Sequence, residues 1–266
     1  MQFSLKAITL TPNLNPKGDF MRNIKAIIEY DGTNYHGFQK QPQQGLPTIQ
    51  GTLEKCFQEV LKEPVVVIGA GRTDAGVHAA GQVINFLTTS KIPLERFPLA
   101  LNSRLPEDIV VKEVQEVEED FHAQYSAKGK YYVYRIYNNR IPSVFYSRYA
   151  YFVPYPLNLE IIKEGCKLFI GRHNFKSFSA SGTSVKSFER TIFSLEVKVN
   201  GSLWEFHIKG DGFLYNMVRI IVGTLVELGK GKRSLTSIRE ALEKQDRTLA
   251  GETAPAHGLC LKEVFY

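Results

Sequence analysis

The ten residues from Gly69 to His78, GAGRTDAGVH, combine an acid, a base and hinge glycines in one short segment. The β-branched run 65–68 before them predicts a buried strand, and the alternating run 82–86 after them predicts a half-buried one. The segment is therefore expected to be a loop between two stiff elements, where catalytic side chains are often placed. Asp74 is its candidate catalytic carboxylate.

Two other interpretations of this loop compete with catalysis. A strand followed by Gly69-x-Gly71 opens like a dinucleotide-binding loop, but Asp74 stands at the third glycine position, where its carboxylate would face the pyrophosphate. The plainer alternative is a glycine-shaped turn in which Arg72 and Asp74 form a solvated ion pair. For the loop taken alone we prefer that plainer alternative, so the choice depends on the rest of the chain.

The composition narrows the class of protein. With 266 residues, 43% of them hydrophobic, the chain can bury one or two cores without metals or disulfides. No stretch approaches the roughly 18 apolar residues of a membrane span. The three cysteines lack C-x-x-C spacing, which argues against a disulfide framework or a zinc site and fits a reducing compartment. We expect a cytoplasmic protein that does not enter a membrane.

Charge is distributed unevenly along the chain. Residues 1–125 carry 12 Lys and Arg against 15 Asp and Glu, whereas residues 126–266 carry 21 against 12. Such a basic half suits a polyanion, chiefly phosphates, although many proteins of high pI bind no nucleic acid.

The order of elements predicts an α+β fold. Strands are expected at 23–30, 109–117, 131–137, 192–199, 203–209 and 259–264, and helices at 48–61, 94–102, 159–170, 213–228 and 235–243. This rhythm predicts two ferredoxin-like α/β units that form a mixed, largely antiparallel sheet with a central catalytic cleft. We expect an N-terminal extension (1–20), an N-terminal α+β domain carrying the Asp74 loop (21–120) and a basic C-terminal α+β domain (121–266).

Several segments carry a family resemblance. They are GAGRTDAGVHAAGQVINF (69–86), YDGTNYHGFQ (30–39), TIQ (48–50), LPEDI (105–109), FHA (121–123), DGFLYNMVRIIVGT (211–224) and APAHGLCL (254–261). In this order they resemble the tRNA pseudouridine synthase A family, and the resemblance extends from Arg22 to Tyr266. It implies an isomerase that converts uridine to pseudouridine at positions 38–40 in the anticodon arm of tRNA, as a homodimer and without a cofactor.

The resemblance also implies the catalytic residues. Asp74 matches the catalytic aspartate, and Tyr132 matches the tyrosine that stacks on the target base, although in so aromatic a strand core packing is the alternative. Because burial raises the pKa of a carboxyl group, a cation is needed to keep Asp74 charged, and the resemblance assigns that part to Arg219. Apolar neighbours surround Arg219 in the sequence, so its guanidinium needs a carboxylate partner.

Further residues are expected to bind the RNA. Arg72 is the expected base-flipping residue, since its planar group can fill the space that a flipped base leaves. Two segments resemble RNA-contacting parts of the family, namely Phe121, His122, Ala123, Gln124 and Tyr125, and Thr183, Ser184, Val185, Lys186 and Ser187. The family usually has a more basic patch before its tyrosine, whereas only Lys128 and Lys130 directly precede Tyr132.

Two other functions stay open at this point. One is a non-catalytic RNA-binding protein on the same fold. The other is a metal-dependent hydrolase using Asp74 and His78, but the histidines of the family-like segments have no ligand spacing, so we predict no metal site. The combination of Asp74, Tyr132 and Arg219 favours the isomerase, because a binding protein has no need of all three.

Overall fold

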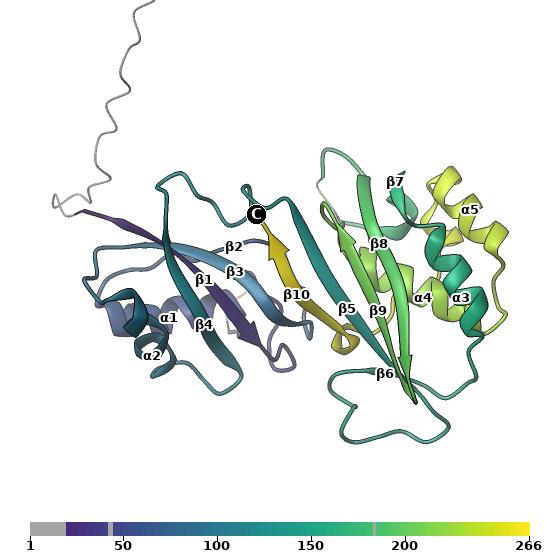
Figure 1. The fold of residues 1–266 in the computed structure, drawn as a ribbon, viewed down its shortest axis with the longest axis horizontal. Coiled ribbons are helices and arrows are strands. Elements are labelled where there is room, and N and C mark those ends of the chain that lie inside the picture. Colours follow the sequence, from purple (N-terminus) through teal and green to yellow (C-terminus); the bar gives the residue numbers. More distant parts are fainter. Residues whose placement is uncertain (1–19, 42–44, 183–184) are drawn as a thin grey trace, which may run out of the picture.

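The computed structural model describes residues 20–41, 45–182 and 185–266 (Figure 1). Apart from Phe20, the predicted N-terminal extension lies outside the described residues. The strands are β1 (Arg22–Tyr30), β2 (Ile68–Gly69), β3 (His78–Thr88), β4 (Ile109–Val117), β5 (Gly129–Asn138), β6 (Tyr151–Val153), β7 (Gly171–Asn174), β8 (Glu189–Asn200), β9 (Leu203–Gly210) and β10 (Leu259–Phe265). The α-helices are α1 (Ile49–Leu61), α2 (Phe97–Asn102), α3 (Leu159–Lys167), α4 (Met217–Gly229) and α5 (Leu235–Lys244).

The described strands form one ten-stranded sheet in the order β4-β1-β3-β10-β5-β9-β8-β7, with β2 on β3 and β6 on β5. The chain order β1-α1-β2-β3-α2-β4 and the spatial order β4-β1-β3-β2 define a ferredoxin-like unit. The second half repeats this pattern, since β5-α3-β8-β9-α4-β10 takes the order β10-β5-β9-β8. The predicted fold class, two ferredoxin-like units in a largely antiparallel sheet, is therefore confirmed.

The two halves meet at a short parallel pairing between β3 and β10. Cys260 pairs with His78 and Leu261 with Ala79, while the other edge of β10 pairs antiparallel with β5. In Figure 1 the yellow β10 lies between β3 and β5, so the last strand of the chain closes the middle of the sheet. The predicted division into two domains near residues 118–128, between β4 and β5, stays a prediction.

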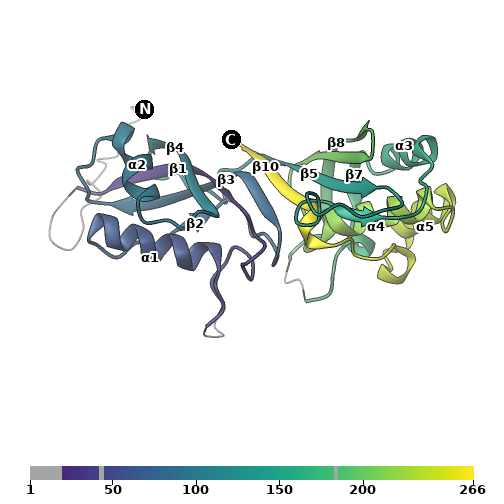
Figure 2. The same cartoon turned by 90° about the horizontal axis from the view of Figure 1, so that it is seen from below.

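Aromatic packing fixes helices α1 and α2 on the first half of the sheet. Phe57 of α1 lies 5.1 Å from Phe86 of β3, and Phe97 of α2 lies 6.5 Å from the same ring, measured between ring centroids. Thr48 caps α1 as its side chain accepts a hydrogen bond from Gly51 N. Figure 2 shows α3, α4 and α5 gathered on the other half.

Some predicted elements differ from the structure. The expected strand 65–68 is wrong in its first three residues, because only its end reaches β3; Val66 is 71% exposed while the valines on either side are buried. The helix expected from residue 213 begins at Met217, since Asn216 has a left-handed backbone (φ 60°). The helix expected to reach residue 170 ends at Lys167, and the short edge strands β6 and β7 were not predicted.

Candidate active site

The loop between β2 and β3 carries Asp74, and the segment after β1 holds it in place. Phe38 N donates a hydrogen bond to Thr73 O (3.0 Å), and Gly76 N donates to Tyr35 O (3.3 Å). From the sheet, Gln82 Nε2 donates to Gly71 O (2.8 Å). The loop is thus fixed from both sides before any substrate binds.

Two glycines of the segment after β1 are required by this close approach. Gly37 has φ +89°, and a Cβ built on it would lie 2.7 Å from Thr73 O. A Cβ on Gly32 would lie 2.0 Å from Val77 O. Any larger residue would push the loop that carries Asp74 out of position.

Asp74 forms an ion pair with Arg219, which comes from the other half of the sheet. Arg219 Nη1 lies 3.3 Å from Asp74 Oδ2, and both side chains are mostly buried, at 17% and 25% exposure. Among the described residues Arg72 makes no ion pair, so the alternative of a solvated Arg72–Asp74 pair is wrong. The structure therefore brings together the two residues that the sequence analysis paired.

Arg219 has two further acceptors that the sequence analysis missed. Its Nε donates to Ala254 O (2.7 Å) and its Nη1 to Asn216 Oδ1 (2.7 Å). The segment around Ala254 packs so closely on α4 that a Cβ on Gly223 would lie 1.9 Å from Glu252 O. The family-like runs 211–224 and 254–261 were the available signal, because they contain Asn216, Gly223 and Ala254.

Burial and the ion pair act in opposite directions on Asp74. Burial raises the pKa of its carboxyl group, while the charge and hydrogen bond of Arg219 lower it; burial prevails and the pKa is raised. Arg219 thus offsets only part of the increase in the Asp74 pKa that burial causes. A carboxylate with a raised pKa is more basic than an exposed aspartate.

Tyr132 lies in the middle of the sheet, on β5 between Leu261 of β10 and Ile208 of β9. It is 7% exposed, and its ring meets Phe213 edge-on, with centroids 5.2 Å apart. Burial raises its pKa well above the usual tyrosine range, and the charge of Asp74 adds to this shift. The neighbouring Tyr134 is fully buried, as expected for a core residue.

The remaining predicted RNA contacts lie in two segments. Ala123 is buried, whereas Tyr125 is 79% exposed. The Tyr125 ring stacks on the His122 ring, with centroids 4.2 Å apart. Phe121 is half-buried and Gln124 exposed. Thr183 and Ser184 lie outside the described residues; Val185 is half-buried, and Lys186 and Ser187 are exposed like Arg72. Their contacts with RNA stay predictions.

His78 is engaged in a contact between the halves. Its Nδ1 lies 3.1 Å from Asp31 Oδ1, and its Nε2 lies 3.0 Å from Arg148 O. Across the part of the chain that the structure describes, no three His, Cys, Asp or Glu side chains are grouped to hold a metal ion. None of the described helices is long and apolar enough to cross a membrane.

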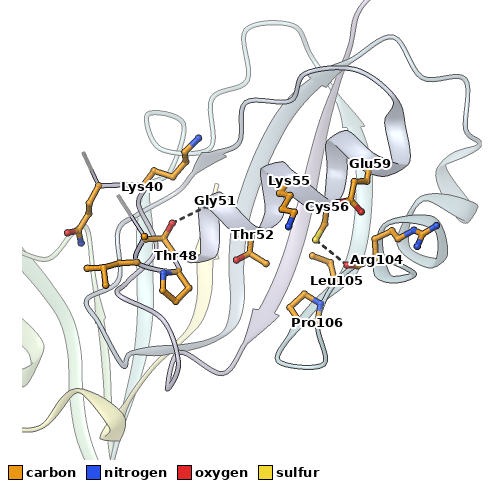
Figure 3. Close-up of a pocket in the computed structure, with 14 residues that line it drawn as sticks. Lys40, Thr48, Gly51, Thr52, Lys55, Cys56, Glu59, Arg104, Leu105 and Pro106 are labelled. Carbon is orange, nitrogen blue, oxygen red and sulfur yellow. Dashed lines mark hydrogen bonds between the residues drawn. The ribbon is translucent and has the colours of Figure 1, made fainter. Parts of the chain in front are cut away.

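A cavity of about 660 Å³ lies elsewhere, between α1 and the segment 104–106 (Figure 3). Lys40, Lys55, Cys56 and Arg104 are among the residues that line it. None of the predicted site residues does, so this cavity is separate from the Asp74 site.

The structure has two paired ferredoxin-like units, with an Asp–Arg pair and a tyrosine at the centre of the sheet. Comparison with related proteins is needed to assign this arrangement to the class of RNA-modifying isomerases. The tRNA pseudouridine synthase family profile matches residues 26–126 and 166–266. The chain belongs to the tRNA pseudouridine synthase family, whose members are isomerases.

Curated relatives agree over nearly the whole chain. The tRNA pseudouridine synthase A of Acetivibrio thermocellus is 52% identical over 246 residues, 92% of this chain and 100% of that protein. The tRNA pseudouridine synthase A 2 of Clostridium perfringens is 48% identical, with the same coverage. A crystal structure of a Cbf5-Nop10-Gar1 complex matches with TM-score 0.37 and 11% identity over 90% of this chain, which spans 58% of that solved chain.

Proposed function

We propose that the protein converts uridine to pseudouridine at positions 38, 39 and 40 in the anticodon arm of tRNA, with Asp74 as its catalytic carboxylate. The observation that carries this proposal is the pairing of Asp74 with Arg219 beside Tyr132, in a chain of the tRNA pseudouridine synthase family. The enzyme works in the cytoplasm and needs neither cofactor nor metal.

The reaction explains why a buried carboxylate is needed. The N1–C1′ bond of the uridine breaks, the base turns, and C5 joins C1′; N1 gains a proton and C5 loses one, so the product is an isomer. Carboxylates bond to or stabilise electron-poor sugar carbons in other glycosyl chemistry. Asp74 acts in this way at C1′, adds to the base, or removes a ribose proton, and each route requires its ionised form.

Tyr132 and Arg219, which belong to the other half of the sheet, assist the reaction at Asp74. Tyr132 stacks on the target base, and Arg219 favours the charged form of Asp74. The exposed Arg72 enters the space left by the flipped base, because a base inside a helical stack cannot reach the buried carboxylate. The segments 121–125 and 183–187 contact the RNA around it.

The substrate is held by shape and charge, in a twofold dimer. Targets at several neighbouring positions require reading of backbone and shape, as structured RNA recognition generally does. The basic half of the chain supplies the charge, and a homodimer lets one tRNA lie across both subunits. A non-catalytic RNA-binding role is not favoured, because it leaves the Asp74–Arg219 pair without a purpose.

The decisive experiment is to incubate the purified protein with unmodified tRNA and map pseudouridine at single-nucleotide resolution. We expect modification at positions 38–40. Modification only outside the anticodon arm overturns the substrate assignment but leaves the chemistry; no modification of any RNA overturns both. Light scattering of the active protein tests the dimer, and a fully active monomer contradicts it.

A further inference from the structure

Lys130 places a cation directly against the loop that carries Asp74. A Cβ built on Gly71 would lie 2.5 Å from Lys130 Nζ, so the ammonium group touches the backbone of that loop. Lys130 is also on β5 two residues before Tyr132. Because side chains alternate along a strand, the two share one face of the sheet, about 7 Å apart along β5.

Among the described residues, no ion pair or hydrogen bond involves the Lys130 ammonium, although its side chain is mostly buried. Burial and the positive charge of Arg190 both lower the pKa of Lys130. An unpaired charge on a mostly buried side chain lowers the stability of the folded protein. A bound anion would remove this cost.

Arg190 of β8 is the second cation of the site. Gly210 of β9 pairs with both Lys130 and Ile192, which brings the start of β8 near the start of β5. Within the part of the chain that the structure describes, Arg190 Nη1 donates to backbone oxygens alone, those of Ser187 (3.0 Å) and Glu189 (2.6 Å).

The nearby carboxylates Glu189 and Asp211 have other partners, and a glycine lies beside each cation. Glu189 binds Arg172 (2.6 Å), and the Asp211 carboxylate accepts a hydrogen bond from Thr191 N (2.9 Å). Gly71 lies against Lys130, and a Cβ on Gly212 would lie 3.5 Å from Arg190 Nε. Neither of these two carboxylates is paired with Lys130 or Arg190, so both cations keep their charge for an anion from outside the protein.

We propose that Lys130 and Arg190 bind a backbone phosphate of the substrate RNA next to the target uridine. This inference rests on the proposed function, because it assigns the nucleotide's base to Tyr132 and a phosphate beside it to this pair. A nucleotide anchored at both points is held with its sugar toward Asp74. Lys130 is thus a substrate-positioning residue rather than a catalytic one.

The first test compares Lys130→Gln and Arg190→Gln with Lys209→Gln. Lys209 is an exposed lysine over the Tyr131 ring, so its substitution makes the same change in charge on the other face of the sheet. We expect the first two variants to lose roughly tenfold to hundredfold in kcat/KM on tRNA, the worth of a charge-assisted hydrogen bond. Lys209→Gln is expected to stay near wild type.

The salt dependence of binding separates a phosphate contact from a structural role. The slope of log affinity against log salt concentration should fall by about 0.7 to 0.9 for each lost contact, while Lys130→Arg keeps the slope. If Lys130→Gln fails to fold, Arg190→Gln and Lys130→Arg carry the test. The proposal is overturned if Lys130→Gln and Arg190→Gln both keep the salt slope and the kcat/KM of the wild type.

A neutral phosphate identifies the partner directly. In tRNAs carrying one methylphosphonate 5′ or 3′ of the target uridine, one substitution should slow the wild type as much as the combined Lys130→Gln and Arg190→Gln exchange does, and should slow that double variant no further. The proposal is overturned if, at both the 5′ and the 3′ position, the methylphosphonate slows the double variant by the same factor as it slows the wild type. Wild-type protein that makes no pseudouridine in any tRNA contradicts the proposed function instead.

Discussion

Arg219 Nη1 lies 3.3 Å from Asp74 Oδ2, although the two residues are 145 positions apart and belong to opposite halves of the sheet. Asp74 stands four residues before His78, which pairs with Cys260 of β10. Ala254, which holds the Arg219 guanidinium, leads into the same strand. The site is therefore complete only when the last strand of the chain has joined the two halves.

Asp74→Asn is expected to abolish pseudouridine formation while the protein stays folded. The amide keeps the shape of the side chain but has neither the charge nor the nucleophilicity. Since burial raises the pKa of Asp74 in the folded state, its stabilising contribution is present below the unfolded-state pKa and is lost as pH rises through the folded-state pKa. The Arg219 guanidinium loses its carboxylate but keeps Ala254 O and Asn216 Oδ1 as acceptors, so we expect a lower melting temperature in a protein that still folds.

Thermal unfolding and pseudouridine mapping check this expectation, with Asp120→Asn as the matched control because Asp120 is an exposed residue of the β4–β5 loop. The control should keep both activity and melting temperature. Turnover close to wild type in Asp74→Asn would remove Asp74 from the catalytic role.

The pH profile of kcat/KM should show an acid limb above the ordinary aspartate value of 3.8, because burial raises the pKa of Asp74. Arg219→Gln removes the charge that lowers this pKa, so the limb moves to higher pH and activity at fixed pH falls. Arg219→Lys keeps a positive charge and should shift the limb less. An acid limb that stays in place in Arg219→Gln contradicts the assignment of the limb to Asp74.

Local sequence patterns predicted most of the elements but only part of the site. The strand at 109–117 and the hairpin strands across Asn200 and Gly201 follow from alternation and turn residues, and the structure contains them. The pairing of β10 with β3 does not follow from local pattern, because it joins strands about 180 residues apart. Likewise Ala254 holds Arg219 through a backbone carbonyl, which any residue type provides.

Tyr132→Ala should remove most activity without unfolding the protein. Stacking on a base is worth about 1 to 3 kcal/mol, so a loss of roughly tenfold to hundredfold in kcat/KM is expected. Tyr132→Phe keeps the stack, and among the described residues the Tyr132 hydroxyl has no hydrogen-bond partner to lose. Single-turnover rates of Tyr132→Ala and Tyr132→Phe separate the contribution of the ring from that of the hydroxyl. A folded Tyr132→Ala enzyme with a normal rate would show that the base stacks elsewhere.

Arg72→Ala should impair base flipping while stability is unchanged, because the side chain is exposed and forms no ion pair among the described residues. Flipping costs a few kcal/mol and costs least for a mismatched base. The rate on a tRNA with a paired target uridine should therefore fall roughly tenfold or more, and clearly less on the same tRNA with that uridine mismatched. Arg72→Lys keeps the charge without the planar surface and should behave like Arg72→Ala. An equal loss on both tRNAs, rescued by lysine, would make Arg72 a phosphate contact instead.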